Sequence, residues 1–352
     1  MLAFILRRLL GLVPVLVGIS LLVFLIPRII GGDPARIMLG ERASATALER
    51  LREELGLTKP LFLNPEAMQQ EGPLALFKAQ YPEFVLNALK GDLGRSIFRL
   101  TEVRQELAHR FPATLELALL AMLFAVVIGI PAGVIAALYH RSYIDTGIMF
   151  LALAGVSFPI FWLAIIMIYI FAVNLGWLPP SGRSDPILFK DFTTLSGLYL
   201  FDTLIQRRFD LFVNALKHII LPSIALGTIP LAIVVRMTRS AMLDILSQDY
   251  IRTAKAKGLM QRLVINKHAL RNALLPVVTV VGLSFGSLLS GAILTETVFA
   301  WPGIGRWVYE AIASRDYPII QGGVLFAASI FVVVNLLVDL SYALIDPRIQ
   351  YR

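Results

Sequence analysis

The sequence predicts an all-α integral membrane protein with six membrane-spanning helices and a folded external segment between the first and second spans. Three observations predict this class. Hydrophobic residues make up 57% of the 352 residues and charged residues only 16%, whereas about a quarter of a soluble domain is charged. The mean hydropathy is +0.75, and the apolar residues come in long blocks. Basic residues gather between these blocks, as in a regular membrane topology.

Six segments are long enough to cross a hydrocarbon core of roughly 30 Å as helices. They cover approximately 9–29, 113–138, 146–173, 217–236, 273–297 and 318–343. The first segment follows Arg7 and Arg8 and so imitates a signal peptide. Its apolar run is too long for that role, and no small-residue cleavage site follows it. We therefore expect it to be a retained span.

Lys and Arg residues in short loops predict which side of the membrane each loop faces. Arg7 and Arg8 place the N-terminus in the cytosol, and Arg348 and Arg352 place the C-terminus there. The segment 236–271 carries eight Lys and Arg residues against two Asp residues, which is +6 of the formal net charge of +8. Six spans with both termini inside are consistent with this pattern.

The sequence divides into three regions. Residues 1–29 hold the N-terminal region and the first span, 30–112 form the external segment, and 113–352 form a core with five spans and a basic loop at 236–275. The external segment is expected to be folded, because apolar residues recur at helical spacing over 46–55. A second, weaker helix is predicted over 73–90.

The basic loop has the pattern of an amphipathic helix. From Arg239 to Lys257, polar and apolar residues recur in steps of three and four, so each set lies on its own face. Gly258 is expected to end this helix, because a left-handed conformation costs Gly nothing. A second short helix then leads to Leu275 and Pro276, which are expected to form the turn into the next span.

This loop admits two interpretations. An interfacial amphipathic helix would place its Lys and Arg side chains among anionic lipid headgroups. A coupling helix would instead fit into a groove on a soluble ATPase, which could supply the nucleotide chemistry that this chain lacks.

Several classes of site lack the residues that they need. The chain has no Cys, so no disulfide or thiolate metal site can form. It also lacks a Walker-type glycine loop, a Rossmann fingerprint and a Gly-x-Ser-x-Gly elbow. The four His residues do not show the spacing of metal ligands. We expect no catalytic residue, no metal site and no bound cofactor, and no nucleic acid as a partner, because the excess positive charge follows membrane topology.

The loop also resembles a known motif. Arg252-Thr253-Ala254, followed by Gly258 and by Leu275-Pro276, resembles the "EAA" loop of permease subunits from binding-protein-dependent ABC importers. A Glu of the motif is replaced by Arg252, its first Ala by Thr253, and the Gly-to-Pro spacing is longer. These departures resemble the dipeptide/oligopeptide/nickel subfamily.

Seven further segments are similar, in order, to the B-type permease subunit of that subfamily. They are the N-terminal run from Arg7-Arg8, Gly32-Asp33-Pro34, Gly91-Asp92-Leu93-Gly94, Glu296-Thr297-Val298-Phe299, Trp301-Pro302-Gly303-Ile304-Gly305, Arg315-Asp316-Tyr317-Pro318 and Asp346-Pro347-Arg348. The similarity covers nearly the whole chain.

The resemblance implies a type I ABC importer permease fold in the cytoplasmic membrane of a bacterium or archaeon. It also implies four kinds of partner: a second homologous permease subunit, two ABC ATPase subunits or two copies of one, an extracytoplasmic solute-binding protein, and the lipid bilayer. ATP and Mg²⁺ would be bound by the ATPase subunits. The ATPase contact would be formed by Tyr250, Arg252, Thr253, Ala254, Lys255, Lys257, Gly258 and Leu259.

Residues inside the spans give further expectations. Carboxylates in a membrane are costly and mark functional sites by default, which singles out Glu116, Glu296 and Asp339. Glu116 is expected near the outer, solvated end of its span, and Glu296 either caps the following turn or faces the pathway. Pro159 is expected to kink the third span. A small-residue side of the fifth span, which includes Ser284 and Ser287, is expected to pack against the partner subunit or line the pathway.

Two other functions compete with the importer permease. An ion-coupled secondary transporter would show inverted repeats or several paired membrane charges, and an intramembrane enzyme would need a convergent nucleophile, base or metal set. Neither pattern occurs in the sequence. Peptides are the expected substrate, with nickel complexes and oligosaccharides as alternatives within the same machinery.

Overall fold

The structure, a computed structural model, describes residues 2–30, 33–40 and 42–345. Within these ranges the chain is helical, and the only extended pairing is an isolated bridge between Arg95 and Glu102. The all-α prediction is therefore confirmed. The chain divides into two compact units: unit 1 comprises Phe111–Arg306 and the chain from Ile330 onward, and unit 2 comprises Leu2–Arg110 and Trp307–Ser329.

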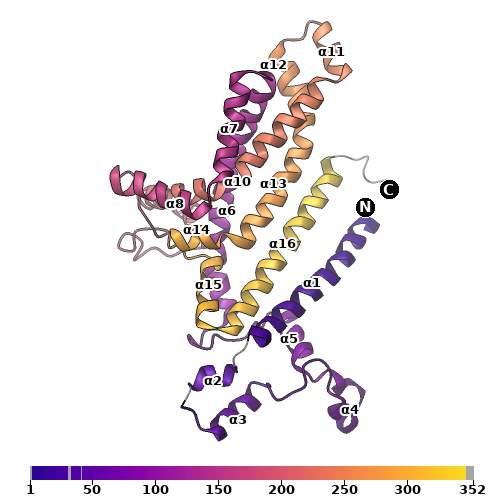
Figure 1. Cartoon of the computed structure of the whole chain (residues 1–352), viewed down its shortest axis with the longest axis vertical. Coiled ribbons are helices and arrows are strands. Elements are labelled where there is room, and N and C mark those ends of the chain that lie inside the picture. Colours follow the sequence, from indigo (N-terminus) through magenta and orange to yellow (C-terminus); the bar gives the residue numbers. More distant parts are fainter. Residues whose placement is uncertain (1, 31–32, 41, 346–352) are drawn as a thin grey trace. The chain divides into compact units, whose positions relative to one another are not determined.

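Figure 1 labels most of the helices of the two units. Unit 1 contains most of α6 (Val103–Leu138), α7 (Tyr143–Ser157), α8 (Ile160–Met167), the π-helix η2 (Ile168–Asn174), α9 (Tyr199–Ile205), α10 (Phe209–Leu246), α11 (Asp249–Ala256), α12 (Gln261–Leu263), the π-helix η3 (Val264–Leu270), α13 (Arg271–Gly291), α14 (Ile293–Val298), the start of α15 (Ile304–Ser314) and the end of α16 (Tyr317–Ile345). Unit 2 contains α1 (Leu2–Ile30), α2 (Pro34–Leu39), α3 (Ala45–Glu54), α4 (Pro65–Glu71), the 3₁₀ helix η1 (Pro73–Phe77) and α5 (Gln80–Leu89), together with the remaining parts of α6, α15 and α16.

In the part of the chain that the structure describes, four continuous helices are long and apolar enough to cross a membrane: Val103–Leu138, Phe209–Leu246, Gln261–Ser290 and Tyr317–Val338. They correspond to four of the six predicted spans. The first predicted span lies in α1, which is 29 residues long and contains the apolar stretch Leu10–Leu25. The fifth predicted span, 273–297, extends beyond the end of its helix. α13 ends at Gly291, and α14 begins separately at Ile293.

The third predicted span, 146–173, is not one helix. α7 and the α8–η2 pair meet at an angle of 101°. Pro159 lies at this break and cannot donate the backbone hydrogen bond that would continue α7. Phe158, the residue before it, has the extended conformation (φ −90°, ψ 136°) that a following Pro favours. The expected kink is therefore a complete interruption of the helix.

The core of unit 1 forms where α6 and α10 approach closely. Gly133 and Gly129 of α6 face α10, and a Cβ at Gly133 would lie 2.7 Å from the carbonyl oxygen of Val235. On α10, a Cβ at Gly227 would lie 2.7 Å from the carbonyl oxygen of Ala121. Only residues without a side chain allow backbones to come this near. Buried residues of α6, α10 and α13 then form one apolar cluster around this contact.

The small residues of α13 serve two different surfaces. Gly282 and Gly286 face Val338 and Phe331 of α16 in the same unit. The glycine side of the fifth span therefore packs against the chain's own last helix. The serines on α13 lie on another face, described below.

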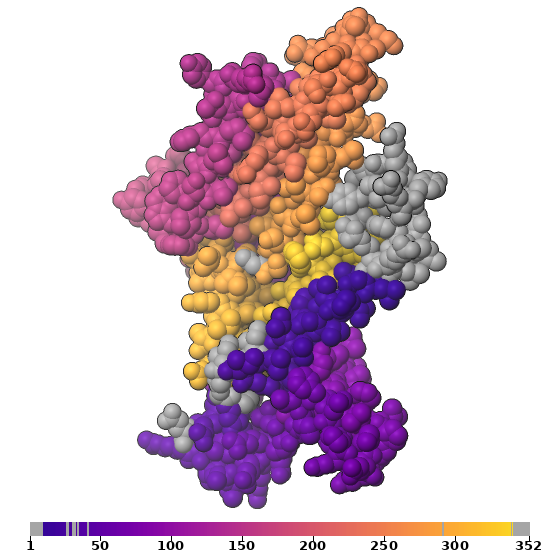
Figure 2. Space-filling model, turned by 45° about the vertical axis from the view of Figure 1, so that its right-hand side comes forward, coloured from indigo at the N-terminus to yellow at the C-terminus, as the bar shows by residue number. Residues whose placement is uncertain are grey.

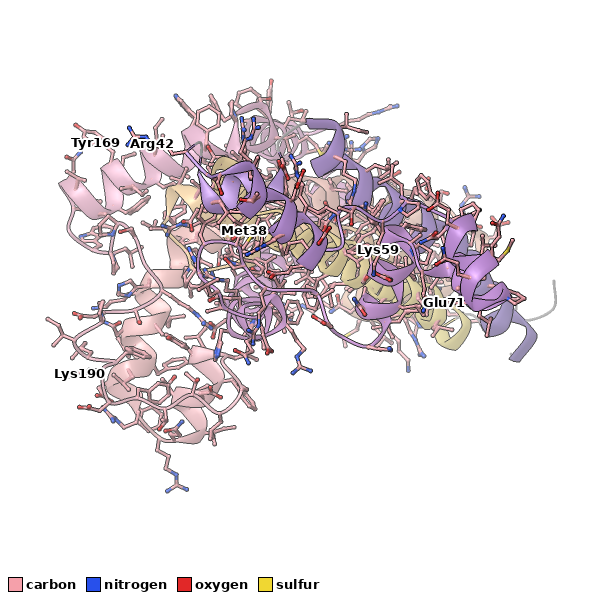
Figure 3. The ribbon with its side chains drawn as sticks, turned by 90° about the horizontal axis from the view of Figure 1, so that it is seen from below. Met38, Arg42, Lys59, Glu71, Tyr169 and Lys190 are labelled. Atoms are coloured by element: carbon pink, nitrogen blue, oxygen red, sulfur yellow. The ribbon has the colours of Figure 1, made fainter. Side chains whose placement is uncertain are left out.

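Unit 2 shows that the external segment is folded. Phe24 near the end of α1 packs against Phe62 and Tyr81, with ring centroids 6.2 and 5.3 Å apart. The helix predicted over 46–55 is confirmed as α3, whereas the region predicted as one helix over 73–90 contains η1 and α5. Two exposed ion pairs lie on the surface of this unit: Lys59 pairs with Glu83 at 2.7 Å, and Lys78 pairs with Glu71 (Figure 3 labels Lys59 and Glu71).

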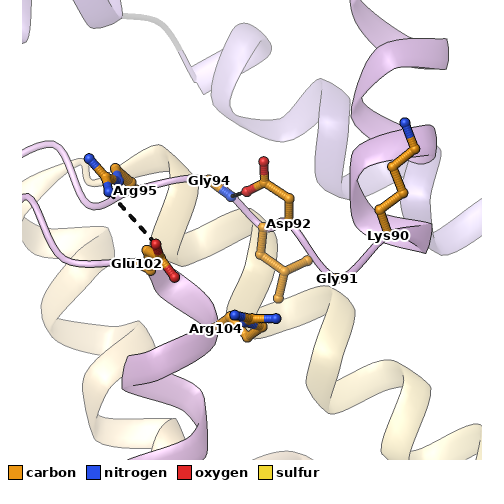
Figure 4. A pocket seen from close by; sticks show the side chains of 8 residues that line it. Lys90, Gly91, Asp92, Gly94, Arg95, Glu102 and Arg104 are labelled. Carbon is orange, nitrogen blue, oxygen red and sulfur yellow. Dashed lines mark hydrogen bonds and ion pairs between the residues drawn. The ribbon is translucent and has the colours of Figure 1, made fainter.

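The Gly91-Asp92-Leu93-Gly94 segment forms a tight turn in unit 2. Both glycines have positive φ, of 81° and 83°, and an Asp92 carboxylate oxygen accepts the Gly94 N–H at 2.9 Å. Just beyond it, the Ser96 hydroxyl donates to the carboxylate of Asp316 at 2.5 Å, so the chain after the turn is bound to the Arg315–Pro318 segment. An open polar cavity of about 380 Å³ lies beside this turn, lined by both basic and acidic residues (Figure 4).

Candidate functional site

A cavity of about 350 Å³ lies in unit 1 between α8, α10 and α13. Its lining residues are Ile160, Leu226, Ile229, Pro230, Ile233, Leu283, Ser284, Ser287 and Leu288. Two of the sequence-predicted residues, Ser284 and Ser287, thus lie together in the wall. Pro159 is the residue before Ile160 and forms the N-cap of α8, so it positions the α8 edge of the cavity.

The cavity wall is apolar apart from the two serines. No lining residue carries a charge. Ser284 and Ser287 are one helical turn apart on α13, so their hydroxyls offer a short polar track across an otherwise aliphatic surface. Such a wall can accommodate molecules of varied shape without binding any one charged group tightly.

The basic loop forms a second candidate site at one end of unit 1, where its surface is uncovered (Figure 2, orange). The sequence predicted one helix from Arg239 to Lys257, and this prediction is wrong. α10 continues to Leu246, and α11 starts afresh at Asp249. At the break, the backbone of Gln248 is extended (φ −71°, ψ 148°). The Ser247 hydroxyl donates a hydrogen bond to the carbonyl oxygen of Asp244, as hydroxyls near helix ends do.

Gly258 ends α11 as predicted. Its φ is +75°, and the flanking hydrogen bonds form a Schellman motif. The Gly258 N–H donates to the carbonyl oxygen of Lys255 at 3.0 Å, and the Leu259 N–H donates to that of Ala254 at 3.4 Å. A Cβ at this position would meet nothing within 4 Å, so the backbone conformation alone favours Gly here.

The two faces of α11 have different environments. Ile251 and Ala254 are buried against residues of η3 and α13. Arg252, Lys255 and Lys257 are exposed on the other face, and the Arg252 pair with Asp249 is long, at 3.4 Å, and fully solvated. The Thr253 hydroxyl bonds back to the Asp249 carbonyl oxygen at 3.0 Å. The result is a rigid short helix with a basic outer face.

Tyr250 fastens α11 to the start of the next span. The side-chain amide of Asn272 donates to the Tyr250 hydroxyl at 2.9 Å and to the carbonyl oxygen of His268 at 3.1 Å. This contact holds the loop's first helix to η3 and α13. The sequence placed Tyr250 in the loop but carried no signal for its partner, which is 22 residues away.

Leu275 and Pro276 do not form a turn. Both lie inside α13, which begins at Arg271 and follows η3 without a break. The prediction of a loop-to-span turn here is therefore wrong. A Pro removes one donor from a helix, and the wider π-helical turn directly upstream is the kind of local adjustment with which membrane helices accommodate it.

Glu296 is fully buried and organises a turn. One carboxylate oxygen accepts the Thr114 hydroxyl at 2.7 Å, and the other accepts the Arg306 backbone N–H at 2.9 Å. A Cβ at Gly303 would collide with this carboxylate. The Trp301-Pro302-Gly303 turn thus wraps around Glu296, which does not line the cavity. The side chain of Asp339 lies outside the described residues.

Glu116 is not solvated, contrary to the prediction. Its carboxylate lies 2.5 Å from a guanidinium nitrogen of Arg183, and both side chains are only 7% exposed. The other carboxylate oxygen accepts the Leu200 N–H at 2.7 Å. Arg183 also stacks over the Tyr199 ring at 3.9 Å and donates to the Gly197 carbonyl oxygen. This pair anchors the connection between η2 and α10, the part of unit 1 that includes Lys190 (Figure 3).

Two family models and several known proteins match this chain. The family model described as "Binding-protein-dependent transport system inner membrane component" matches residues 129–351, and the model for the N-terminal part of such membrane components matches residues 1–118. The chain is 51% identical to the dipeptide transport system permease protein DppB of Alkalihalophilus pseudofirmus, over 100% of both chains.

Two further similarities extend this picture. The chain is 40% identical to the glutathione transport system permease protein GsiC of Escherichia coli O6:H1, again over 100% of both chains. Among solved structures, the MetNI methionine ABC transporter in an inward-facing conformation matches with a TM-score of 0.52 at 16% identity, over 68% of this chain and 96% of that chain. The latter match supports the importer permease fold.

The buried Glu116–Arg183 pair yields a stability prediction. Arg183→Gln leaves the Glu116 carboxylate buried without its counter-charge, which costs about 3–5 kcal/mol when one partner of a buried pair is removed. We expect a clear fall in the melting temperature of the purified protein in detergent. The control is Arg208→Gln, which breaks an exposed pair with Asp210. Equal melting temperatures for the two variants would contradict the assignment.

Proposed function

The chain belongs to the family of binding-protein-dependent transport system inner membrane components, and on that premise we propose that it is one of two permease subunits of an ATP-driven importer of peptides. The observation that carries this proposal is the 51% identity over the full length of both chains with a dipeptide permease. Relatives named for dipeptide and glutathione transport favour peptides over nickel complexes or oligosaccharides as the substrate.

In the proposed assembly, this chain and a second permease subunit enclose the translocation pathway. A solute-binding protein delivers the peptide on the outer side, where the segment 30–112 receives it. Two ATPase subunits bind ATP and Mg²⁺ on the cytosolic side. Both termini of this chain lie in the cytosol, in keeping with the Arg residues near them. The permease itself performs no covalent chemistry.

The surface of α11 supports the ATPase interpretation over the lipid interpretation. An interfacial helix inserts its apolar face into the bilayer. In α11 that face is already occupied, because Ile251 and Ala254 are 0% and 8% exposed against the chain's own residues. The free face carries Arg252, Lys255 and Lys257, and Met260 at the tip of the loop is 76% exposed. A basic face with a protruding apolar tip fits a groove with an acidic rim on a protein.

The cavity between α8, α10 and α13 is the proposed part of this subunit's pathway. Its aliphatic wall with two hydroxyls offers no fixed charge to the termini or side chains of a peptide. A weakly binding pathway allows peptides of different sequence to pass and leaves selection to the binding protein. The pathway role is therefore proposed for Pro159, Ser284 and Ser287. Glu296 instead holds the 301–303 turn, whose Trp301 packs in the same apolar cluster as Leu226 and Leu288 of the wall.

A reconstitution experiment tests the function. Proteoliposomes would contain this chain with its co-encoded second permease and ATPases, and labelled dipeptide would be supplied with the co-encoded binding protein. We expect uptake only when ATP is present on the ATPase side and all components are included. Uptake by this chain alone, driven by an ion gradient, would instead support the secondary-transporter alternative.

Filling the cavity tests the proposed pathway. Ser287→Leu adds bulk to the cavity wall, and we expect the rate of dipeptide uptake to fall about tenfold, which corresponds to roughly 1.4 kcal/mol. ATP hydrolysis and assembly should persist. Ser290→Leu is the matched control, because Ser290 is on the same helix but outside the lining, where its hydroxyl bonds back to the Gly286 carbonyl oxygen. The same loss in both variants would contradict the pathway assignment.

Charge reversal tests the docking face. Lys255→Glu combined with Lys257→Glu should weaken binding of the ATPase subunit by about tenfold, since each exposed ion pair contributes up to roughly 1 kcal/mol. The loss should shrink at high ionic strength, which screens exposed charges. Co-purification and calorimetric titration would measure it. Lys190→Glu is the control and should leave ATPase binding unchanged. Lys190 is in the connection between the third and fourth predicted spans, which faces outward when both termini are in the cytosol.

A further inference from the structure

Asp145 and Arg239 form a bidentate ion pair in unit 1. The Arg239 Nε donates to one Asp145 carboxylate oxygen at 2.6 Å, and an Arg239 Nη donates to the other at 2.7 Å. The Asp145 side chain is 5% exposed and that of Arg239 is 23% exposed. Two parallel, charge-assisted hydrogen bonds hold both distance and angle between the groups. This pair therefore fixes the start of α7 to α10.

Asp145 is also bound into its own turn. Its carboxylate accepts the Arg141 N–H at 3.0 Å, and its N–H donates to the Ser142 hydroxyl that caps α7. Arg141 has a positive φ of 61°, which a non-Gly residue adopts only when surrounding contacts support it. Asp145 thus connects three segments: the tight turn after α6, the first turn of α7, and the side of α10.

The pair lies on the line between the two candidate sites. Arg239 is two helical turns before the end of α10 at Leu246, and α11 begins three residues later at Asp249. On the other side, α7 leads to the break at Phe158 and Pro159, directly before the cavity-lining Ile160. A displacement of α11 can reach the α8 edge of the cavity through α7 only if α7 and α10 move together.

The loop's own ion pair cannot do this. Arg252 and Asp249 are both in α11, and their side chains are 74% and 96% exposed. An exposed pair contributes little and is screened by salt. The buried, two-bonded geometry of Asp145 and Arg239 is far more resistant to separation.

We propose that Asp145 and Arg239 are positioning residues that form a permanent latch, through which movement of α11 and the inner end of α10 carries α7 and so shifts the cavity wall at Ile160. This inference rests on the proposed importer function and concerns how force crosses the subunit. The latch stays closed throughout the transport cycle, and the break at Phe158–Pro159 is the point that bends.

Removing one partner tests the latch in the reconstituted complex. Arg239→Gln should lower the number of peptides transported per ATP hydrolysed by about tenfold, within the usual range of a coupling between two sites. Arg236→Gln is the matched control: Arg236 is on the same helix and exposed, and its loss should leave the ratio unchanged. Equal ratios in the two variants would overturn the latch.

A double variant separates coupling from stability. Asp145→Asn with Arg239→Gln removes both charges, so no uncompensated charge stays buried, and Asn can still accept the Arg141 N–H. If the pair acts as one unit, the double variant should lose no more coupling than Arg239→Gln alone. Additive losses would mean that the two residues act separately and would overturn the proposal.

A distance measurement gives a readout that a purely structural role would not produce. The chain has no Cys, so spin labels can be attached at Tyr143→Cys on α7 and Ser240→Cys on α10, both exposed positions. Their distance should be the same without nucleotide and with ATP, and should change between these states only when Arg239→Gln is added. A change in the otherwise unaltered complex would overturn the latch. Absence of any ATP-dependent peptide uptake would instead contradict the importer function itself.

Discussion

Three buried carboxylates hold connecting segments of unit 1 to its long helices. Removing a carboxylate from water is costly unless a donor replaces the lost hydration. Arg183 from the connection before α10 meets Glu116, and the turn after α14 wraps around Glu296. Arg239 meets Asp145 at the opposite end of α10. Each contact joins a helix to a segment that would otherwise be free to move, so the apolar surroundings act as the constraint that positions the loops.

The two candidate sites differ in their chemistry, and the difference suits the proposed function. The cavity wall is aliphatic with two hydroxyls, which favours passage over tight binding. The α11 surface is basic, and its apolar face is already packed against η3 and α13. A partner bound there contacts a rigid element, because Gly258 closes the helix and Tyr250 fastens it to Asn272. In the proposed assembly, the docking helix α11 and the break at Phe158–Pro159 determine where a displacement from the ATPase side bends the subunit.

Several predictions that depended on composition or on local sequence pattern were correct. Apolar blocks predicted the long helices, and Gly258 predicted the end of α11 because its left-handed conformation suits Gly. Predictions from local pattern were wrong at positions where tertiary contacts determine the structure. The periodicity from Arg239 to Lys257 continued across Ser247, where two helices meet. Pro276 was predicted to form the turn into the next span together with Leu275, but it lies inside α13. Glu116 was placed in solvent because its partner is 67 residues away.

The membrane class, the approximate position of the apolar segments, the basic loop with its terminating glycine, and the family resemblance that the comparisons confirmed could all be predicted from the sequence. These features follow from composition and short-range spacing, which can be read directly from the amino-acid sequence. The tertiary structure was needed to show which carboxylate pairs with which cation. It also showed that the small residues of α13 are divided between α16 and the cavity, and that the third span is broken. Partners such as Asp145 and Arg239 are 94 residues apart, and no local pattern encodes a pairing that exists only after the helices have packed.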